Sequence, residues 1–543
     1  MDNDLINGLT TDLATVELGD PRRWAVLWIL CGSLVLVVVS VSSLNVAIPS
    51  IQSALGTSGS ELQWIIDSYA LVFAGLLLPA GALGDRYGRR EALVFGLVVF
   101  GIAAVGGMLA EGATELIVWR GVMGAGAAFI MPATLSIVAT VFAPAERPKA
   151  IAIWAGFAGA GGVIGLISSG LLLRAFWWGS VFAVNIPLVV LMVAAVVLFV
   201  PTSRDPDATR LDPVGAVLSI IGLVALVFGI IEGPEKGWGA TPTLGAFAIS
   251  ALALVAFVVW ELRSDHPMLD PRYFRKRRFS LGSLTITATF FGIFGMFFVI
   301  TQFLQFVQQY DALEAGLRIL PYGIVLLIVS PKAADLAEHF GDRLVMLVGM
   351  VIATIGFVVL GLLQADSPYW PTALGLIIVA VGTGLLMPPA TTALVASLPA
   401  AKAGVGSAMN DTTREVGGAI GIAVGGALLS IGYRSGVKGS LDGLSPEATE
   451  SAQDSIGGLL ANPETQHLLD VGGEAFTDGM QLAMFAAAGL LALAAIAVAV
   501  FHPRDDADIT SDNTSPGSTG HSTDDPTGHS TDDPSSQPTG VSP

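Results

Sequence analysis

The sequence predicts an all-helical integral membrane protein that crosses a bilayer about fourteen times. Of its 543 residues, 53% are hydrophobic and only 13% are charged, whereas soluble domains carry roughly a quarter charged residues. The charges gather in short segments between uncharged runs, and runs such as Trp24 to Ala47 and Ala475 to Phe501 reach the ~20 residues that a membrane-spanning helix needs. Many of the 64 glycines lie inside these runs, where small residues let helix backbones approach closely.

Apolar runs that are bounded by charges, or by proline and glycine, predict the individual spans in chain order. Segment 1–23 is polar and acidic and does not resemble a cleavable signal peptide, so the first run is expected to remain as a helix. We expect spans at residues 24–47, 61–83, 92–110, 115–142, 148–172, 179–200, 211–232, 241–261, 281–306, 315–335, 343–364, 370–395, 403–430 and 475–501.

The basic residues between these spans predict the orientation of the chain. Lys and Arg concentrate in cytoplasmic segments of membrane proteins. With the N-terminus inside, eighteen basic residues fall in inner segments and five in outer ones. An even number of spans then returns the C-terminus to the cytoplasm, so both termini are expected to be cytoplasmic. The densest basic cluster, Arg272 to Arg278, is expected near anionic lipid headgroups and not on a nucleic acid.

Several function classes find no support in the residues. Cys31 is the only cysteine and lies in the first apolar run, so no intrachain disulfide can form. The six histidines lack metal-ligand spacing, and we expect no metal site and no other cofactor. The chain contains no Gly-x-x-x-x-Gly-Lys-Ser/Thr sequence for nucleotide phosphates. An enzyme is therefore not expected.

The segment between the second and third spans carries a specific motif. It reads Gly81-Ala-Leu-Gly-Asp85-Arg86-Tyr-Gly88-Arg89-Arg90 and resembles the signature loop of the major facilitator superfamily. The glycines allow close packing and a sharp turn, and Asp85 can pair with helix termini and with basic side chains of the other half. Such a latch is expected to break when a transporter opens inward. The alternative is that these charges only set the topology.

Further segments resemble the fourteen-helix drug:proton antiporter branch of that superfamily. They are Asn45-Val-Ala-Ile-Pro49, Gln63-Trp64-Ile-Ile-Asp67-Ser-Tyr69, the stretches Trp178 to Pro187 and Leu211 to Gly215, and Gly404 to Gly418. The resemblance covers residues 24–501 and is greatest for exporters of quaternary ammonium compounds and other lipophilic cations.

The resemblance implies a domain organisation. Two six-helix bundles (24–200 and 281–501) would enclose a central cavity, with a substrate site near the midplane. Two extra helices (201–262) and a basic cytoplasmic loop (263–280) would connect them. Segment 1–23 and a disordered acidic tail (502–543) would be cytoplasmic, and the acidic loop 431–474 extracytoplasmic.

The implied function is secondary active transport in the cell membrane, as a monomer, with protons and a lipophilic, cationic small molecule as partners. Two alternatives stay open. One is export of an endogenous lipid or secondary metabolite, or weakly coupled facilitated movement. The other is a non-transporting sensor or assembly protein.

Three positions depart from the branch. Ser40 stands where the first helix usually carries an Asp, and Met123 replaces a Gln three residues after Arg120. The fifth span lacks the proline of the antiporter motif but keeps a glycine-rich face. The helix-packing glycines of that face include Gly156, Gly161, Gly165 and Gly170.

Charges inside spans are functional candidates, because an unpaired charge in hydrocarbon costs several kcal/mol. Asp67 and Arg120 lie at similar depths in the second and fourth spans, and we hypothesise that they form a proton-sensitive pair. Alternatively, Asp67 is a headgroup-level residue that only orients its helix. Asp411, Arg414 and Glu415 share one side of the thirteenth span and predict a second proton or cation site, or a structural Asp411–Arg414 ion pair.

Aromatic, Met and Gln side chains predict the substrate cavity, because lipophilic cations bind aromatic faces. The candidates are Ser40, Trp64, Tyr69, Met296 and Gln305. Each of them could instead face lipid or the helix core.

Overall fold

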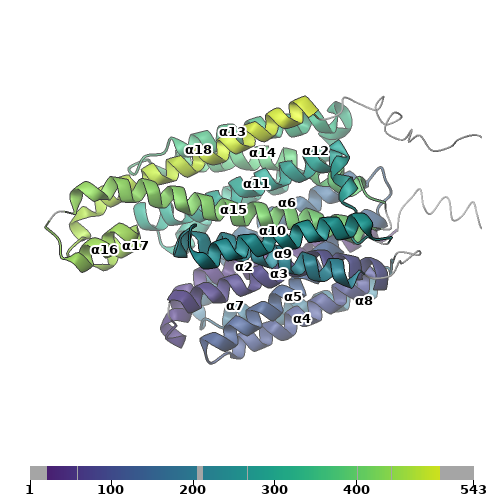
Figure 1. Cartoon of the computed structure of the whole chain (residues 1–543), viewed down its shortest axis with the longest axis horizontal. Coiled ribbons are helices and arrows are strands. Elements are labelled where there is room, and N and C mark those ends of the chain that lie inside the picture. Colours follow the sequence, from purple (N-terminus) through teal and green to yellow (C-terminus); the bar gives the residue numbers. More distant parts are fainter. Residues whose placement is uncertain are drawn as a thin grey trace, which may run out of the picture. The chain divides into compact units, whose positions relative to one another are not determined.

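The computed structural model describes residues 21–57, 59–204, 212–265, 267–399, 402–441 and 443–501. Fourteen helices in these ranges are long and apolar enough to cross a membrane, which confirms the predicted number. The principal helices (Figure 1) are α2 (Arg23–Leu55), α3 (Gly59–Tyr87), α4 (Arg89–Leu109), α5 (Ala113–Val141), α6 (Arg147–Ala175), α7 (Ser180–Ala183), α8 (Asn185–Phe199), α9 (Pro213–Lys236), α10 (Thr241–Arg263), α11 (Arg277–Gln302), α12 (Ala312–Phe340), α13 (Asp342–Gly361), α14 (Tyr369–Ala396), α15 (Ala403–Val437) and α18 (Leu469–Phe501). We call α2 to α8 the N-half and α11 to α18 the C-half.

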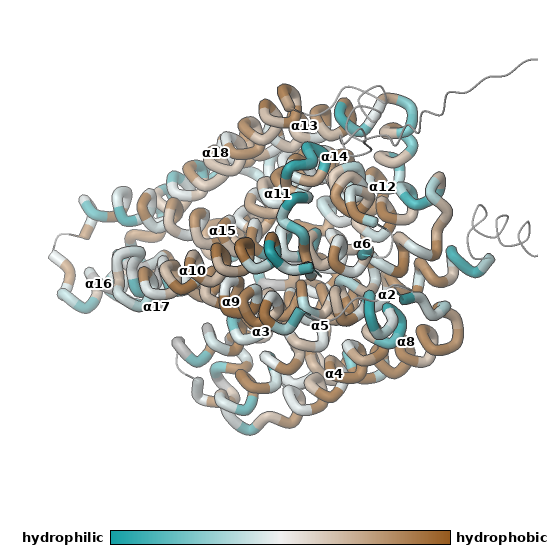
Figure 2. Tube along the Cα trace, turned by 45° about the vertical axis from the view of Figure 1, so that its right-hand side comes forward, coloured by the Kyte–Doolittle hydropathy of each residue, from teal (hydrophilic) through white to brown (hydrophobic). Residues whose placement is uncertain are grey.

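Hydropathy follows this division into helices. In Figure 2 the helices are mainly hydrophobic along their lengths, and the hydrophilic residues gather at helix ends and connections. Residues 1–20 and 502–543 lie outside the described residues, so the acidic N-terminal segment and the disordered tail stay predictions.

Several helix boundaries differ from the predicted ones. The first helix continues to Leu55, the thirteenth span continues to Val437, and the last helix begins at Leu469. The expected loop 431–474 is therefore shorter, and it contains the short helices α16 (Pro446–Asp454) and α17 (Ile456–Ala461). Amphipathic or broken helices of this kind do not produce a long apolar run, which is why the sequence pattern missed them.

Two spans are interrupted within the membrane-spanning length. The sixth span breaks at Val184 between α7 and α8, because Pro187 has no N–H to continue the hydrogen-bond ladder. The ninth span ends in a π-helical turn, Phe303–Val307, followed by Gln309 in a left-handed conformation with φ 58°. Single π-helical turns are frequent at functional sites.

Facing glycines allow close helix contacts in both halves. A Cβ added to Gly96 of α4 would lie 2.7 Å from the carbonyl oxygen of Gly126 in α5. In the C-half, a Cβ added to Gly349 of α13 would lie 2.7 Å from the carbonyl oxygen of Gly382 in α14. The two halves thus repeat one packing solution, in which backbones touch without intervening side chains.

The two extra helices lie side by side across the contact between the halves. Helix α9 packs against both α3 and α15, which also contact one another, and α10 packs against α9 (Figure 1). Val227 of α9 is buried against Leu71 and Ala74 of α3. The side chain of Val224 fills the space above Gly75.

Helix α6 connects the halves through two separate glycine faces. Gly161 and Gly165 lie against Val38 and Val39 of α2, within the N-half. Gly156 and Gly170 lie against Ser330 and Leu313 of α12, in the C-half. The expected single glycine face is therefore wrong. Fourteen residues separate Gly156 from Gly170, so the α6–α12 contact extends over ~21 Å.

This packing predicts that Gly165→Val destabilises the fold while Gly162→Val is tolerated. A Cβ at Gly165 would lie 1.9 Å from the Ser42 hydroxyl, whereas nothing lies within 4 Å of a Cβ at Gly162. Overpacking of this kind costs about 1–3 kcal/mol. Thermal unfolding of the purified variants should show a lower melting temperature only for Gly165→Val. Equal melting temperatures would contradict the assigned α2–α6 contact.

Candidate functional site

The loops with most of the basic residues meet at one end of the bundle, which we call the basic end. Arg23 at the start of α2 pairs with Glu146 before α6 at 2.5 Å. The backbone N–H of Arg89 donates to the carbonyl of Ser203 at 2.9 Å. The first contact joins the start of α2 to the α5–α6 connection, and the second joins the α3–α4 connection to the α8–α9 connection.

A carboxylate of the N-half caps a helix of the C-half at the basic end. Asp85 accepts hydrogen bonds from the backbone N–H groups of Gly404 at 2.8 Å and Val405 at 3.1 Å. These groups open α15, where unpaired N–H groups and the helix dipole favour a negative charge. Arg89 contacts Asp85 at 2.8 Å. We call Asp85, Arg89, Gly404 and Val405 the latch.

The latch differs from the expectation in its basic partner. Asp85 does meet a helix terminus of the other half, but its guanidinium partner Arg89 belongs to its own half. The helices touch directly here, because a Cβ on Gly81 would lie 2.5 Å from the Gly404 carbonyl oxygen. Gly88 has φ +124°, a conformation that L side chains rarely adopt.

The other basic residues of the signature loop lie outside the latch. Arg86 lies 5.6 Å from the ring centre of Tyr87. Arg90 pairs with the exposed Glu91 at 3.1 Å. They are therefore placed to contact solvent and headgroups at the basic end.

A buried cluster in the N-half surrounds Arg120, which is 1% exposed. Its guanidinium lies 4.4 Å from the ring centre of Tyr69, and its Nε donates to the carbonyl of Ile65 at 3.1 Å. Its other contact is the sulfur of Met123 at 3.6 Å, to which Ser40 donates from α2 at 3.2 Å. The two positions that depart from the family pattern, Ser40 and Met123, thus contact one another.

The expected pair of Asp67 and Arg120 is not formed. The contacts of Arg120 among the described residues run to Ile65, Tyr69 and Met123 and do not include Asp67. Asp67 shares a helix face with Trp64 and Leu71, at spacings of three and four residues. That face packs on α9, where the Trp64 ring lies 6.2 Å from that of Phe228. Sequence reasoning matched the depths of Asp67 and Arg120 but not their directions around the helix.

A second buried cluster lies in the C-half on α15. Asp411 and Arg414 lie 3.5 Å apart, with side chains 1% and 11% exposed. The amide of Asn410 donates to Asp411 at 3.2 Å and in turn accepts from Thr391 of α14 at 3.2 Å. This chain of polar groups crosses from α15 to α14.

Arg414 and Glu415 extend this cluster toward the N-half. The guanidinium of Arg414 lies 4.6 Å from the ring centre of Phe290 in α11 and 5.4 Å from that of Trp154 in α6. The half-buried Glu415 is within electrostatic range of Tyr69 in α3. The C-half acids and the N-half aromatic residues thus meet where the halves contact one another.

Three polar atoms in these clusters have no hydrogen-bond partner among the described residues. They are Asp411 Oδ2, Arg414 Nη1 and the Tyr69 hydroxyl. Leaving a buried polar atom unsatisfied costs about 1–3 kcal/mol. Such atoms are poised to bind a proton, a water molecule or a polar group of a ligand.

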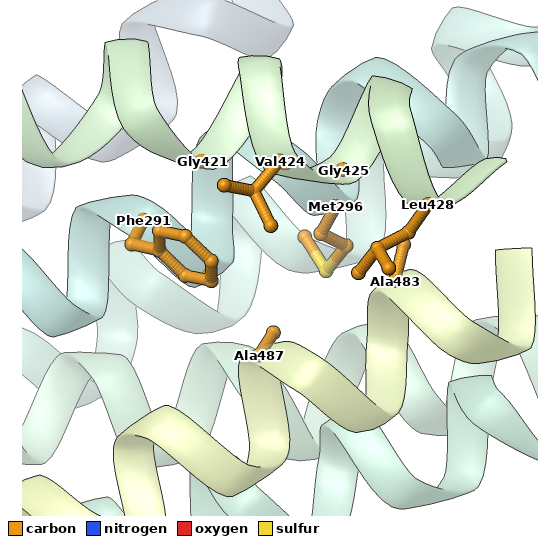
Figure 3. Close-up of a pocket in the computed structure, with 10 residues that line it drawn as sticks. Phe291, Met296, Gly421, Val424, Gly425, Leu428, Ala483 and Ala487 are labelled. Atoms are coloured by element: carbon orange, nitrogen blue, oxygen red, sulfur yellow. The ribbon is translucent and has the colours of Figure 1, made fainter. Parts of the chain in front are cut away.

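The five residues expected to line one substrate cavity lie in separate places. Ser40 and Tyr69 belong to the Arg120 cluster, while Trp64 is 40% exposed beside α9. Met296 lines a narrow apolar gap within the C-half (Figure 3). Phe291 and Val424 line it too, as does Ala487 of α18. Gln305 lies in the π-helical turn of the ninth span.

Sequence reasoning missed Trp154 and Phe290 as site residues. Trp154 is 1% exposed and donates from its indole N–H to Thr134 of α5 at 3.1 Å. A single Trp in a glycine-rich span was the only available signal, since nothing in the sequence pairs it with Arg414. No group of three His, Cys, Asp or Glu side chains suited to a metal occurs in the described part of the chain.

Comparison with known proteins identifies the family. The model of the Major Facilitator Superfamily matches residues 30–422. The chain belongs to the major facilitator superfamily. The chain is 34% identical over 487 residues to the multidrug efflux pump LfrA of Mycolicibacterium smegmatis, covering 88% of this chain and 96% of that protein.

Other superfamily members agree with this assignment. The methyl viologen resistance protein SmvA of Salmonella typhimurium is 32% identical over 485 residues, which are 88% of this chain and 97% of that protein. Among solved structures, the human organic anion transporter MFSD10 superposes with a TM-score of 0.58 at 14% identity, covering 88% of this chain and all of that one. At that identity the likeness shows the fold alone. This major facilitator protein is thus a multi-pass protein of the cell membrane.

The geometry of the latch predicts that Asp85→Asn loosens the basic end. The variant loses the carboxylate charge that faces the α15 N-terminus and Arg89, worth about 1–2 kcal/mol. In a Cys31→Ser background, spin labels at Tyr87 and Phe340, both 62% exposed, would report the distance between the halves. We expect the population with long distances to increase about tenfold. Arg90→Gln, outside the latch, is the matched control, and an unchanged distribution in Asp85→Asn would contradict the role of the latch.

Proposed function

We propose that this protein exports lipophilic, cationic compounds across the cell membrane in exchange for protons, by alternating access of its two halves. One observation carries the proposal: the buried Asp411 and Arg414 and the half-buried Glu415 of the C-half lie near the buried Trp154 and Tyr69 of the N-half. The names of LfrA and SmvA, a multidrug efflux pump and a methyl viologen resistance protein, support the substrate class. In this reading the chain works without a cofactor and is not an enzyme.

Proton coupling is assigned to the acids of α15. Asp411 and Glu415 flank Arg414 at spacings of three residues and one residue, and one guanidinium cannot fully neutralise both carboxylates. A proton that binds either acid removes a charge from a site with little access to water. Binding of a proton and binding of an organic cation at these acids would then exclude one another, which is the requirement for exchange.

Substrate recognition is assigned to the rings that now hold guanidinium groups. Arg120 lies over Tyr69, and Arg414 lies over Phe290 and Trp154. An aromatic face that binds guanidinium can also bind a quaternary ammonium group or an aromatic cation. We infer that substrate replaces Arg414 over these rings and leaves the arginine free to neutralise an acid.

The conformation fits a transporter that is closed at the basic end. The latch joins α3 to α15 there, and α6 contacts α12 over most of the membrane thickness. We propose that the basic end faces the cytoplasm, because Lys and Arg of membrane proteins stay on that side. The division into two bundles and two extra helices, and a monomeric state, belong to the same proposal.

A second candidate, weakly coupled movement of a lipid or secondary metabolite, is favoured by the first helix. Ser40 replaces the usual acid and donates a hydrogen bond to the sulfur of Met123. A serine hydroxyl does not ionise near neutral pH, so this position cannot bind and release the coupling proton. The coupling test below separates the two candidates.

We predict that Asp411→Asn abolishes proton-dependent efflux while Asp67→Asn retains most of it. Asp411 is buried in the cluster between the halves, whereas Asp67 lies on the α3 face that packs on α9. Ethidium efflux should be measured in cells that lack other pumps, with and without a protonophore. We expect a loss of at least about tenfold in Asp411→Asn and a smaller loss in Glu415→Gln.

The opposite result would assign proton coupling to a different site. If Asp67→Asn stopped efflux and Asp411→Asn did not, coupling would lie on the α9 side of α3. Wild-type efflux that is insensitive to the protonophore would favour the second candidate. Surface expression of each variant, measured by immunoblot of membranes, controls for folding.

A further inference from the structure

The segment that joins α10 to α11 is fixed against the C-half at the basic end. We call residues 267–278, which include the first residues of α11, the strap. Lys402 donates from its Nζ to the carbonyl of Pro267 at 2.8 Å, and Lys276 of the strap donates to the carbonyl of Ser397 at 3.3 Å. Met268 and Leu269 are buried, 8% and 4% exposed. One side of the strap is therefore held on the α14–α15 connection at both of its ends.

The other side of the strap presents positive charge. Arg272, Arg275, Arg277 and Arg278 are exposed, and Phe274 beside them is 44% exposed. Arg272 lies 4.0 Å from Asp270. In the described part of the chain, Arg275, Arg277 and Arg278 have no carboxylate partner. Three guanidinium groups and an exposed ring thus lie at the start of α11 without a carboxylate partner among the described residues.

The strap contacts the residues that directly precede the latch residues of α15. Lys402 precedes Gly404 and Val405, whose N–H groups bind Asp85. The α14–α15 connection that carries Ser397 and Lys402 must move away from Asp85 if the basic end opens. Anything that holds the strap in place through Lys276 and Lys402 also restrains this connection.

We propose that the strap binds the phosphate headgroups of anionic phospholipids, and that this binding holds the latch closed. Guanidinium groups pair with phosphate oxygens through paired hydrogen bonds, and basic residues at the membrane surface attract anionic lipids. Phe274 supplies an apolar contact at headgroup depth. The proposal rests on the cytoplasmic orientation of the basic end, but neither lipid binding nor latch closure depends on the nature of the exported compound.

The test compares purified full-length protein in two kinds of nanodisc. One contains phosphatidylcholine alone, and the other has phosphatidylglycerol added as a quarter of the lipid. The strap variant is R275Q/R277Q/R278Q. The matched control, K149Q/R204Q/K332Q, removes three exposed charges of the basic end outside the strap. The rescue variant, R275K/R277K/R278K, keeps the charge. Readouts are bound phosphatidylglycerol by native mass spectrometry and the Tyr87–Phe340 label distance.

In wild type, the matched control and the rescue variant, phosphatidylglycerol should raise the ratio of short to long distances at least about threefold. The strap variant should lose this response and retain fewer bound phosphatidylglycerol molecules, although it elutes as a monodisperse protein. An equal response in the strap variant would overturn the proposal. So would an equal response to inorganic phosphate in phosphatidylcholine nanodiscs, which would assign the site to free phosphate. Ethidium efflux is not among the readouts, so failure here is distinct from failure of the proposed transport.

Discussion

The cost of burying charge away from water governs where this chain places its ionisable side chains. In hydrocarbon, a charge must be paired or hydrogen-bonded within the protein. Asp85 meets this requirement with two backbone N–H groups of the opposite half and with Arg89. Arg120 and Arg414 meet it mainly with aromatic faces, a carbonyl group and Asp411. The contacts of Asp85 and Arg414 involve helices of both halves, so movement between the halves changes the energy of these two charges, whereas the contacts of Arg120 lie within the N-half.

The buried carboxylates at two places along the contact between the halves are hydrogen-bonded to different degrees. At the basic end, both oxygens of Asp85 accept backbone hydrogen bonds and the helices touch at Gly81 and Gly404. About two turns into α15, one oxygen of Asp411 is unsatisfied and Arg414 is shared between an acid and two rings. The first arrangement suits a closed latch. The second leaves room for a proton or a cation, which is why transport and coupling are assigned there.

The number and order of spans could be predicted because a long apolar run is a property of the sequence alone. The latch could be expected because Asp85 lies in a motif whose chemistry needs a helix terminus. The direction of each side chain around its helix could not be predicted, because the residues that it contacts come from distant parts of the chain. Asp67 lies on the helix face of α3 that packs on α9, and the ring of Trp154 lies beside the guanidinium of Arg414. Some glycines of α6 contact α2 and others contact α12. Breaks such as Val184 and the π-helical turn at Phe303–Val307 depend on local hydrogen bonding that hydropathy does not report.

The exchange of protons for an organic cation is tested most directly by following protons themselves. Purified protein in liposomes that contain a pH-sensitive dye would receive an ethidium gradient, with no other source of energy. The account predicts that ethidium movement drives protons in the opposite direction, and that the proton signal disappears in Asp411→Asn. Ethidium movement without a proton signal in the wild-type protein would contradict the account and leave a facilitator without coupling.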